Sequence, residues 1–251
     1  MKNTFRLIGF IALAAIIGLL MTACGGDDDC TTHNWNWSAY ESGSGLRQCQ
    51  NSGCNVTADI GDTGPEGGII FYAAHSGYPA IYVKGYSDAP EGYENFNFDA
   101  YTAYYLEVAP ANETTYGITE YRWSGASAPY YEFPEANAYD REIGSGRRNT
   151  LLILFAELET LDSYVASFNY FGGANNFGWF LPSIDELKFL YSKRAIVNME
   201  TSSSSAWYWS STEEYEPYNN DFAWAIRFDS GWEQKQHKSL NSNYVRSVRA
   251  F

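Results

Sequence analysis

The longest amphipathic pattern lies in the middle of the chain and predicts a helix that starts near Thr150. Apolar residues recur there at intervals of three and four, the repeat of one helix face. Asn149 or Thr150 is the expected N-cap, and Glu157, Glu159 and Asp162 fall off the apolar stripe. The stripe consists of Leu151, Leu154, Phe155, Leu158, Leu161, Val165 and Phe168. We expect this helix to pack on a sheet.

A second, shorter helix has an explicit start signal at Ser183. Pro182 favours an extended approach, Ser183 is a good N-cap, and Glu186 stands three residues later, which is the capping-box spacing. Asp185 and Glu186 also place negative charge at the positive end of the helix dipole. The apolar face is formed by Ile184, Leu187, Leu190 and Tyr191. An aromatic strand at 178–180 leads into this helix, and we expect the helix to belong to the core.

Short apolar runs bounded by turn residues predict the strands. They cover residues 69–73, 80–84, 104–110 and 207–211, and an apolar segment at 245–251 closes the chain. A terminal strand is usually tied into a sheet, because it would otherwise fray. The glycine-rich turn at 61–68 lacks a Gly-Lys-Ser/Thr motif and is followed by a strand, which excludes a phosphate loop.

Near the C-terminus, the alternation of side chains predicts a strand with one buried and one wet face. Trp224, Ile226 and Phe228 alternate there with the set Ala225, Arg227 and Asp229. The segment 212–221 before it reads as a polar loop. Arg246 and Arg249 are expected to be structural hydrogen-bond or ion-pair partners.

The first residues predict a lipoprotein signal peptide over 1–23. Lys2 and Arg6 supply a positive start, and residues 7–20 form an apolar run of signal-peptide length, short for a membrane span. The run ends in Leu-Met-Thr-Ala before Cys24, which resembles a bacterial lipobox with Cys24 as the lipidated residue. An acidic tether follows at 25–29 and resembles surface-export tethers. We therefore expect attachment to the membrane only through the lipid, at the outer membrane or cell surface.

Residues 24–60 combine this tether with a small module that carries three further cysteines. Cys30, Cys49 and Cys54 occur with His33, and three thiols with an imidazole suit tetrahedral zinc. Outside the cytoplasm, however, a disulfide between two of the cysteines is their natural fate and leaves one odd thiol, so the disulfide is the expectation and zinc or neither state is the alternative. We assign no metal and no cofactor at this point.

Composition limits the partners. The chain is 45% hydrophobic and 18% aromatic, enough for a sizeable core with rings left over for a surface. Loss of Met1–Ala23 removes two basic and no acidic residues, so the formal charge changes from −14 to −16. Such a chain is repelled by phosphate backbones and anionic headgroups, which argues against nucleic acid as a partner.

Residues 61–251 resemble the Lcl C-terminal domain family of Legionella collagen-like adhesins in the order and spacing of their motifs. The matching pieces are GPEGGIIFY at 64–72, YLEVAP at 105–110, NT at 149–150, GWFLPSIDEL at 178–187, YWSS at 208–211 and VRSVRAF at 245–251. This resemblance implies an α+β, C-type-lectin-like fold: two helices on small twisted antiparallel sheets, with long loops. The collagen-like adhesins are linked to sulfated polysaccharide, a ligand class that the charge of −16 disfavours.

Two related branches share the implied fold. Formylglycine-generating enzymes use active-site cysteines, and their chemistry is excluded because no cysteine follows Cys54. Proteins diversified by retroelements vary ligand-contacting residues near the C-terminus, which fits the polar and aromatic positions here. Calcium-dependent lectins use Glu-Pro-Asn or Gln-Pro-Asp, whereas Glu216 and Pro217 precede Tyr218 in this chain.

These observations predict a surface-tethered, non-enzymatic protein that binds an external protein or glycan, adhesin-like or receptor-like. No nucleophile elbow, metal-pair spacing or nucleotide motif appears, and His75 and His237 are expected to be solvated. Rigid rings and short polar groups on loops suit recognition. The alternatives are an envelope protein that self-associates through its loops and a glycan hydrolase. The candidate contacts are Trp207, Tyr215, Tyr218, Asn219, Asn220, Asp221, Arg227, Trp232, Gln234, Gln236, Asn241, Asn243 and Tyr244.

Overall fold

The computed structural model describes most of the chain after residue 31. The described residues are 32–37, 44–85, 99–114, 119–123, 137–157, 178–202, 206–216, 221–239 and 243–251, with the side chains of Phe155 and Glu157 excepted. The predicted signal segment, Cys24 and Cys30 lie outside them. Among the described helices, none has both the length and the apolar character needed to span a bilayer.

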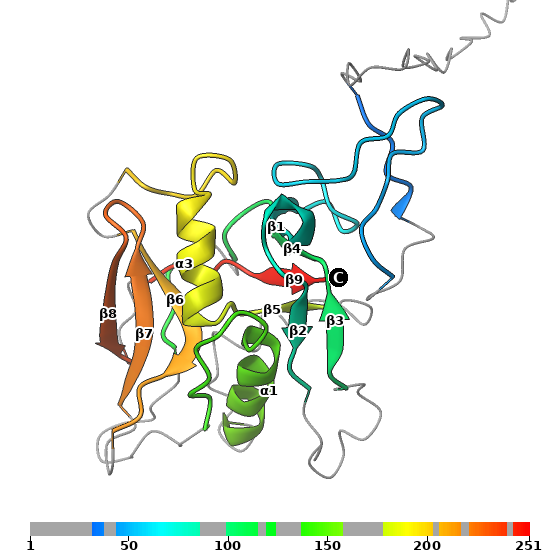
Figure 1. The fold of residues 1–251 in the computed structure, drawn as a ribbon. Coiled ribbons are helices and arrows are strands. Elements are labelled where there is room, and N and C mark those ends of the chain that lie inside the picture. Colours follow the sequence, from blue (N-terminus) through cyan, green and yellow to red (C-terminus); the bar gives the residue numbers. More distant parts are fainter. Residues whose placement is uncertain are drawn as a thin grey trace, which may run out of the picture.

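A four-stranded antiparallel sheet forms the middle of the molecule and contains the last strand of the chain. Its strands are β1 (Ile69–Ala73), β4 (Tyr105–Val108), β9 (Val248–Ala250) and β5 (Trp179–Phe180), in that order. The backbone N–H groups of Tyr104 and Tyr105 donate to the carbonyl of Phe251 at 2.8 and 3.0 Å. The expected C-terminal strand is therefore confirmed, and Figure 1 shows it as the red arrow at the centre.

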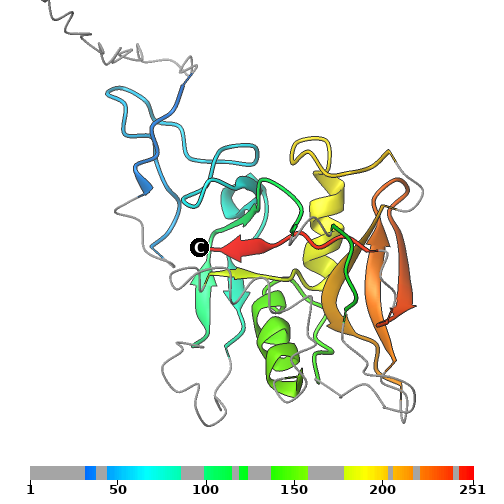
Figure 2. The same ribbon diagram turned by 180° about the vertical axis from the view of Figure 1, so that it is seen from behind.

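Two smaller sheets lie on opposite sides of this centre (Figures 1 and 2). One pairs β2 (Ile81–Val83) with β3 (Tyr101–Ala103). The other contains β6 (Trp207–Glu213), β7 (Phe222–Arg227) and β8 (Trp232–His237), all antiparallel. The sequence pattern gave no indication of β3 or β8. Strand β3 has only three residues, and the residues of β8 are mostly polar. With two helices added, the α+β prediction is confirmed.

Helix α3 (Ile184–Ser192) joins the central sheet to the β6–β7–β8 sheet. Ile184, Leu187 and Leu190 are fully buried, as the predicted apolar face required. They form one core cluster with side chains of both sheets, among them Phe71, Leu106, Tyr208, Ile226 and Val248. The helix is thus the shared core element that fixes the two sheets relative to each other.

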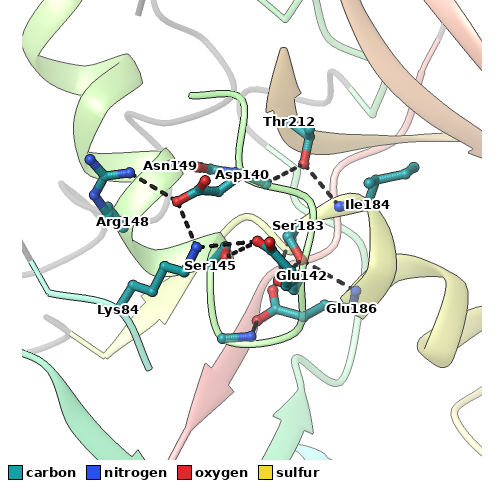
Figure 3. A network of polar contacts seen from close by, with 11 residues as sticks. Lys84, Asp140, Glu142, Ser145, Arg148, Asn149, Ser183, Ile184, Glu186 and Thr212 are labelled. Atoms are coloured by element: carbon teal, nitrogen blue, oxygen red, sulfur yellow. Dashed lines mark hydrogen bonds and ion pairs between the residues drawn. The ribbon is translucent and has the colours of Figure 1, made fainter. Parts of the chain in front are cut away.

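The predicted capping box of α3 is present and extends into a buried polar network (Figure 3). The hydroxyl of Ser183 accepts from the N–H of Glu186 at 3.3 Å, and the Glu186 carboxylate accepts from the N–H of Ser183 at 2.8 Å. The same carboxylate also accepts from the N–H of Gly144 at 2.8 Å. The cap therefore holds the loop before α1 as well as its own helix.

Helix α1 (Gly146–Glu157) begins four residues earlier than predicted, so Asn149 or Thr150 as its N-cap is wrong. Both side chains are buried and bind other segments: the Asn149 amide donates to the Asp140 carbonyl at 2.6 Å, and the Thr150 hydroxyl accepts from the N–H of Leu181 at 3.0 Å. Gly146 lies against Glu186 so closely that no side chain would fit. Packing against α3 therefore sets the start of α1. Residues 158–177, including the rest of the predicted stripe, lie outside the described residues.

The prediction of one wet face on β7 is wrong in the centre of the strand. Ala225, which was assigned to the wet face, is fully buried together with Ala223. Both belong to a second core cluster with Trp123, Trp209 and residues Leu151–Leu154 of α1. The small alanine side chains allow this packing on the second face, a possibility that alternation alone does not reveal.

The two C-terminal arginines have the structural role that was expected. Arg246 is buried and donates to Asn112 Oδ1 at 3.1 Å and to the Pro110 carbonyl at 2.9 Å. Arg249 pairs with the buried Glu107 at 3.0 Å. His75 lies in the short 3-10 helix η2 (Ala74–Ser76) and is exposed, as predicted, with Nε2 3.3 Å from Asp59 Oδ2.

Candidate functional site

Three of the predicted contact residues form a row across one end of the β6–β7–β8 sheet. In the register of the sheet, Arg227 lies directly opposite Trp207 on β6 and directly opposite Trp232 on β8. Residues directly opposite each other in antiparallel strands project to the same face, with Cβ atoms about 5 Å apart. Strand pairing therefore brings together residues that are 20 and 5 positions apart in the chain.

The Arg227 guanidinium lies near both indole rings. Its central carbon is 5.8 Å from the Trp207 ring centroid and 5.4 Å from the Trp232 ring centroid, within the range of cation–π attraction. The two rings are themselves 6.1 Å apart. Trp232 is 55% exposed, although indole is a large apolar group. We call these three residues the Trp–Arg cluster.

The turn after β7 anchors Arg227 from one side. Arg227 Nε donates to Asp229 Oδ1 at 2.6 Å and to Ser230 Oγ at 3.2 Å, and Gly231 at φ 75° closes the turn. The Ser230 hydroxyl, followed by Arg227, lowers the pKa of Asp229 below its ordinary value. Within the described residues, only Nε of Arg227 is engaged in this way. Among the residues that the structure describes, its two terminal nitrogens donate to no protein oxygen.

Gln234 extends the exposed surface of the Trp–Arg cluster, but Gln236 and Asn243 do not. Gln234 is exposed on the same face of β8 as Trp232. Asn243 is fully buried, its backbone bridges Tyr121, and its side-chain amide donates to Gln236 Oε1 at 2.7 Å. The prediction of an exposed contact at Asn243 is wrong, because the segment 119–123 covers it.

The remaining predicted contacts are dispersed over the molecule. Tyr215 is 64% exposed, but it follows β6 at the end opposite Trp207, and its ring meets that of Tyr139 edge-on at 5.2 Å. Tyr244 is half-buried, with its ring 5.3 Å from that of the buried Tyr208, on the core side of the sheet. Asp221 is half-buried before β7. Tyr218, Asn219, Asn220 and Asn241 lie outside the described residues.

A buried ion pair lies at the end of this sheet opposite the cluster and was not predicted. Lys238 Nζ lies 2.5 Å from Glu213 Oε1, and both side chains are excluded from solvent. Glu213 Oε2 accepts from the N–H of Ala138 at 3.0 Å, and the Lys238 ammonium lies 4.6 Å from the Trp123 ring centroid. Sequence gave no signal for this pair, since its residues are 25 positions apart in segments that read as loops.

The described residues contain one group suited to a metal ion, and it is far in sequence from the cluster. His33, Cys49 and Cys54 bring their ligand atoms within 4.8 Å of one another. Cys49 and Cys54 are not joined by a disulfide. Of the states left open by the sequence, the structure therefore does not show a disulfide between these two cysteines.

Comparisons with known proteins place the Trp–Arg cluster inside a known domain. The Lcl C-terminal domain profile matches residues 110–249, more than half of the chain. A search of curated proteins found no match. Among solved structures, the chain is similar to a fimbrial protein from Bacteroides ovatus ATCC 8483, with 16% identity and a TM-score of 0.41 over 78% of this chain. That alignment covers 47% of the fimbrial protein, so this chain spans less than half of its length.

The profile match starts after β4 and ends in β9, within the span 61–251 that the sequence motifs suggested. It includes both helices, the β6–β7–β8 sheet and all three residues of the Trp–Arg cluster. The chain belongs to the Lcl C-terminal domain family.

Proposed function

We propose that this chain is a surface-tethered, adhesin-like protein that binds an external protein or glycan through the Trp–Arg cluster. The observation that carries the proposal is the combination of an exposed Trp232 with an Arg227 whose terminal nitrogens face no described partner. An indole ring offers a flat apolar surface to a sugar ring or to an apolar side chain. The guanidinium beside it donates to hydroxyl, carbonyl or carboxylate oxygens.

The cluster is preorganised, which favours binding. Arg227 is held by Asp229 and Ser230, and its guanidinium already lies within cation–π distance of both indole rings before a ligand arrives. Less side-chain entropy is then lost on association. Tryptophan and arginine are also the residue types most enriched among residues that dominate binding energy.

A binding role suits the cluster better than catalysis. General acid–base chemistry needs a group whose pKa lies near the working pH. The carboxyl group nearest the cluster is Asp229, and the Ser230 hydroxyl and Arg227 lower its pKa. We therefore propose that the protein is not an enzyme and that the cluster acts by contact alone.

Three finer parts of the proposal rest on the sequence. Cys24 carries a lipid that tethers the chain to the outer membrane or cell surface. The domain is a C-type-lectin-like fold, which the adjacency of β1 and β9 to the same strand β4 supports, since it brings the two ends of the domain together. Candidate contacts between residues 205 and 245 are diversified by a retroelement, so close copies of this chain should differ mainly there.

The binding proposal is tested by a matched pair of exposed aromatic residues. Trp232→Ala removes the outer ring of the cluster, and Tyr82→Ala removes a ring that is 65% exposed on β2, on the other side of the molecule. Both chains are screened with the unmodified chain on a glycan array and on immobilised extracellular proteins. We expect Trp232→Ala to weaken the strongest interaction at least about tenfold, and Tyr82→Ala to leave it unchanged.

Equal binding by all three chains, with intact folding by circular dichroism, would contradict the site. A different result would favour the envelope-protein alternative. In that case no probe binds, the unmodified chain self-associates in analytical ultracentrifugation, and Trp232→Ala abolishes the self-association. Release of reducing sugar from an array glycan would favour the hydrolase.

A further inference from the structure

The N-terminal module carries a group of side chains that the binding proposal does not use. We propose that His33, Cys49 and Cys54 form a Zn²⁺ site that fastens residues 32–37 to the following hairpin. The site is independent of the Trp–Arg cluster and lies outside residues 110–249, which the family profile matches.

The distances between the ligand atoms suit tetrahedral zinc. Cys54 Sγ lies 3.6 Å from His33 Nδ1, and the three ligand atoms are all within 4.8 Å of one another. With Zn–S near 2.3 Å and Zn–N near 2.0 Å, a tetrahedral ion separates its sulfur and nitrogen ligands by about 3.6 Å and two sulfur ligands by about 3.8 Å. Small side-chain movements are therefore enough to place one ion between all three.

A backbone turn presents the two cysteines to the same point. Gln48 and Thr57 form a β-bridge, and the N–H of Cys49 donates to the Val56 carbonyl at 2.9 Å. The intervening loop turns back because the N–H of Cys54 donates to the Asn51 carbonyl at 3.1 Å, and Gly53 adopts φ 79°. The cysteines consequently stand on one side of a short hairpin loop and are both buried.

The surroundings of Cys49 favour the thiolate, the form that binds a metal. The N–H of Asn51 points at Cys49 Sγ at 3.5 Å. Burial raises the pKa of Cys49, but the Asn51 and Asn34 N–H groups, Cys54 and His33 outweigh it and lower the pKa from 9.0 to about 7. Zinc binding therefore displaces the proton of Cys49 at a small cost near neutral pH.

His33 is held in position by the segment that carries it. Its ring stacks on Trp35 with centroids 4.9 Å apart. The side-chain amide of Asn51 donates to the Thr32 carbonyl at 3.0 Å, and Arg47 Nε donates to the Trp35 carbonyl at 2.7 Å. These hydrogen bonds align residues 32–37 with the hairpin before any ion is bound. A metal ion then crosslinks the two segments, and a fourth position is left for a donor beyond these three.

The site also has a structural purpose. Trp35, Cys49, Cys54 and Ala58 form a cluster with Ile70, Ala73, Tyr105 and Phe251 of the main domain. This cluster is small, and small modules with little apolar core commonly depend on a metal or a disulfide. Zinc would hold the module in the shape that covers this edge of the central sheet.

The experiment uses the full lipidated chain in detergent, reduced and then loaded with either Zn²⁺ or Co²⁺. We expect about one zinc per chain by mass spectrometry of the metal, and cobalt–thiolate charge-transfer bands in the near ultraviolet. Cys49→Ser and Cys54→Ser should each weaken zinc binding at least about tenfold and reduce the cobalt–thiolate band. Because Cys24 and Cys30 remain in both variants, the difference reports on Cys49 and Cys54.

His33→Gln and His75→Gln form the matched pair for the imidazole ligand. We expect His33→Gln to shift the cobalt spectrum and weaken zinc binding, whereas His75→Gln changes neither. Removal of zinc by a chelator should lower the melting temperature of the unmodified chain, but not that of the double Cys49→Ser, Cys54→Ser variant.

Three results would overturn the site, and two do not depend on a variant that folds. They are an unmodified chain without cobalt–thiolate bands, a Cys49–Cys54 disulfide in peptides from the exported protein, and unchanged bands in the double serine variant.

Discussion

Gly68 stands at a point where three segments leave no room for a side chain. A Cβ there would lie 2.5 Å from the Val108 carbonyl oxygen, 2.8 Å from a Glu107 carboxylate oxygen and 3.1 Å from the Trp179 ring. The Gly68 N–H donates to the same Glu107 carboxylate at 3.0 Å. Close packing therefore requires glycine at this position. The backbone of Gly68 does not adopt a positive φ, so backbone conformation is not the reason.

We expect Gly68→Ala to lower the free energy of unfolding by about 2–3 kcal/mol, because a backbone carbonyl of β4 must move. The matched change is Gly178→Ala, whose Cβ would lie 2.6 Å from Nε of the flexible Arg249 side chain. It should cost less, because that side chain moves without disturbing the sheet. Urea denaturation of both variants measures the difference, and a smaller effect for Gly68→Ala than for Gly178→Ala would contradict the explanation.

The Trp–Arg cluster shows how far single residues were predictable. Trp207, Arg227 and Trp232 were among the predicted contacts because their chemistry suits recognition, and strand pairing places them in one row. Asn243 has equally suitable chemistry but is buried under the segment 119–123. Residue type alone does not distinguish an exposed amide from one that completes an internal hydrogen bond.

At the scale of elements, α3 is the best predicted part of the fold. Its capping box, its buried face and its extended approach all depend on residues within a few positions of one another. The start of α1 was not predictable in the same way, because Gly146 packs against Glu186, which is 40 residues away in sequence. Asp140 adds to this junction by pairing with Lys84 and Arg148, each at 2.9 Å (Figure 3).

Glu186 makes the junction between α3 and α1 sensitive to pH. Burial raises its pKa from 4.5 to about 7, although the N–H groups of Ser183, Gly144 and Gly146 oppose the shift. Between pH 4.5 and 7 the folded chain then binds more protons at Glu186 than the unfolded chain does. The free energy of unfolding contributed by this group falls as pH rises through that window, by about 3 kcal/mol.

We expect Glu186→Gln to flatten this part of the stability profile, measured by urea denaturation at a series of pH values. A residual slope of the same sign remains, since burial also raises the pKa of Glu107. Asp185→Asn keeps Glu186 and should keep the slope; a steep profile in Glu186→Gln would refute the assignment.

At the scale of the whole molecule, the fold closes through its last residues. β9 pairs with β4 and β5, and Phe251 packs against the N-terminal module through Trp37, with ring centroids 5.4 Å apart. The module and the binding sheet lie on different sides of the central sheet (Figure 2).

The proposed tether is tested on the whole chain in cells. We expect Cys24→Ser to shift the protein from the membrane fraction to the soluble fraction, because the acylated residue is the proposed attachment point. Cys30→Ser is the matched control and should stay with the membrane. Fractionation followed by immunoblotting reports the result, and equal membrane retention of both variants would argue against Cys24 as the anchor.

The sequence by itself determined the local elements: the capped helix at Ser183, most of the strands and the C-terminal strand. Each depends on periodicity, a cap or a chain end, and these are local properties. Only the tertiary structure decided that β7 is covered on both faces, that Lys238 meets Glu213, and that Trp207, Arg227 and Trp232 share a row. The physical reason is that burial, ion pairing and strand register depend on neighbours distant in the chain, and side-chain periodicity carries no information about them.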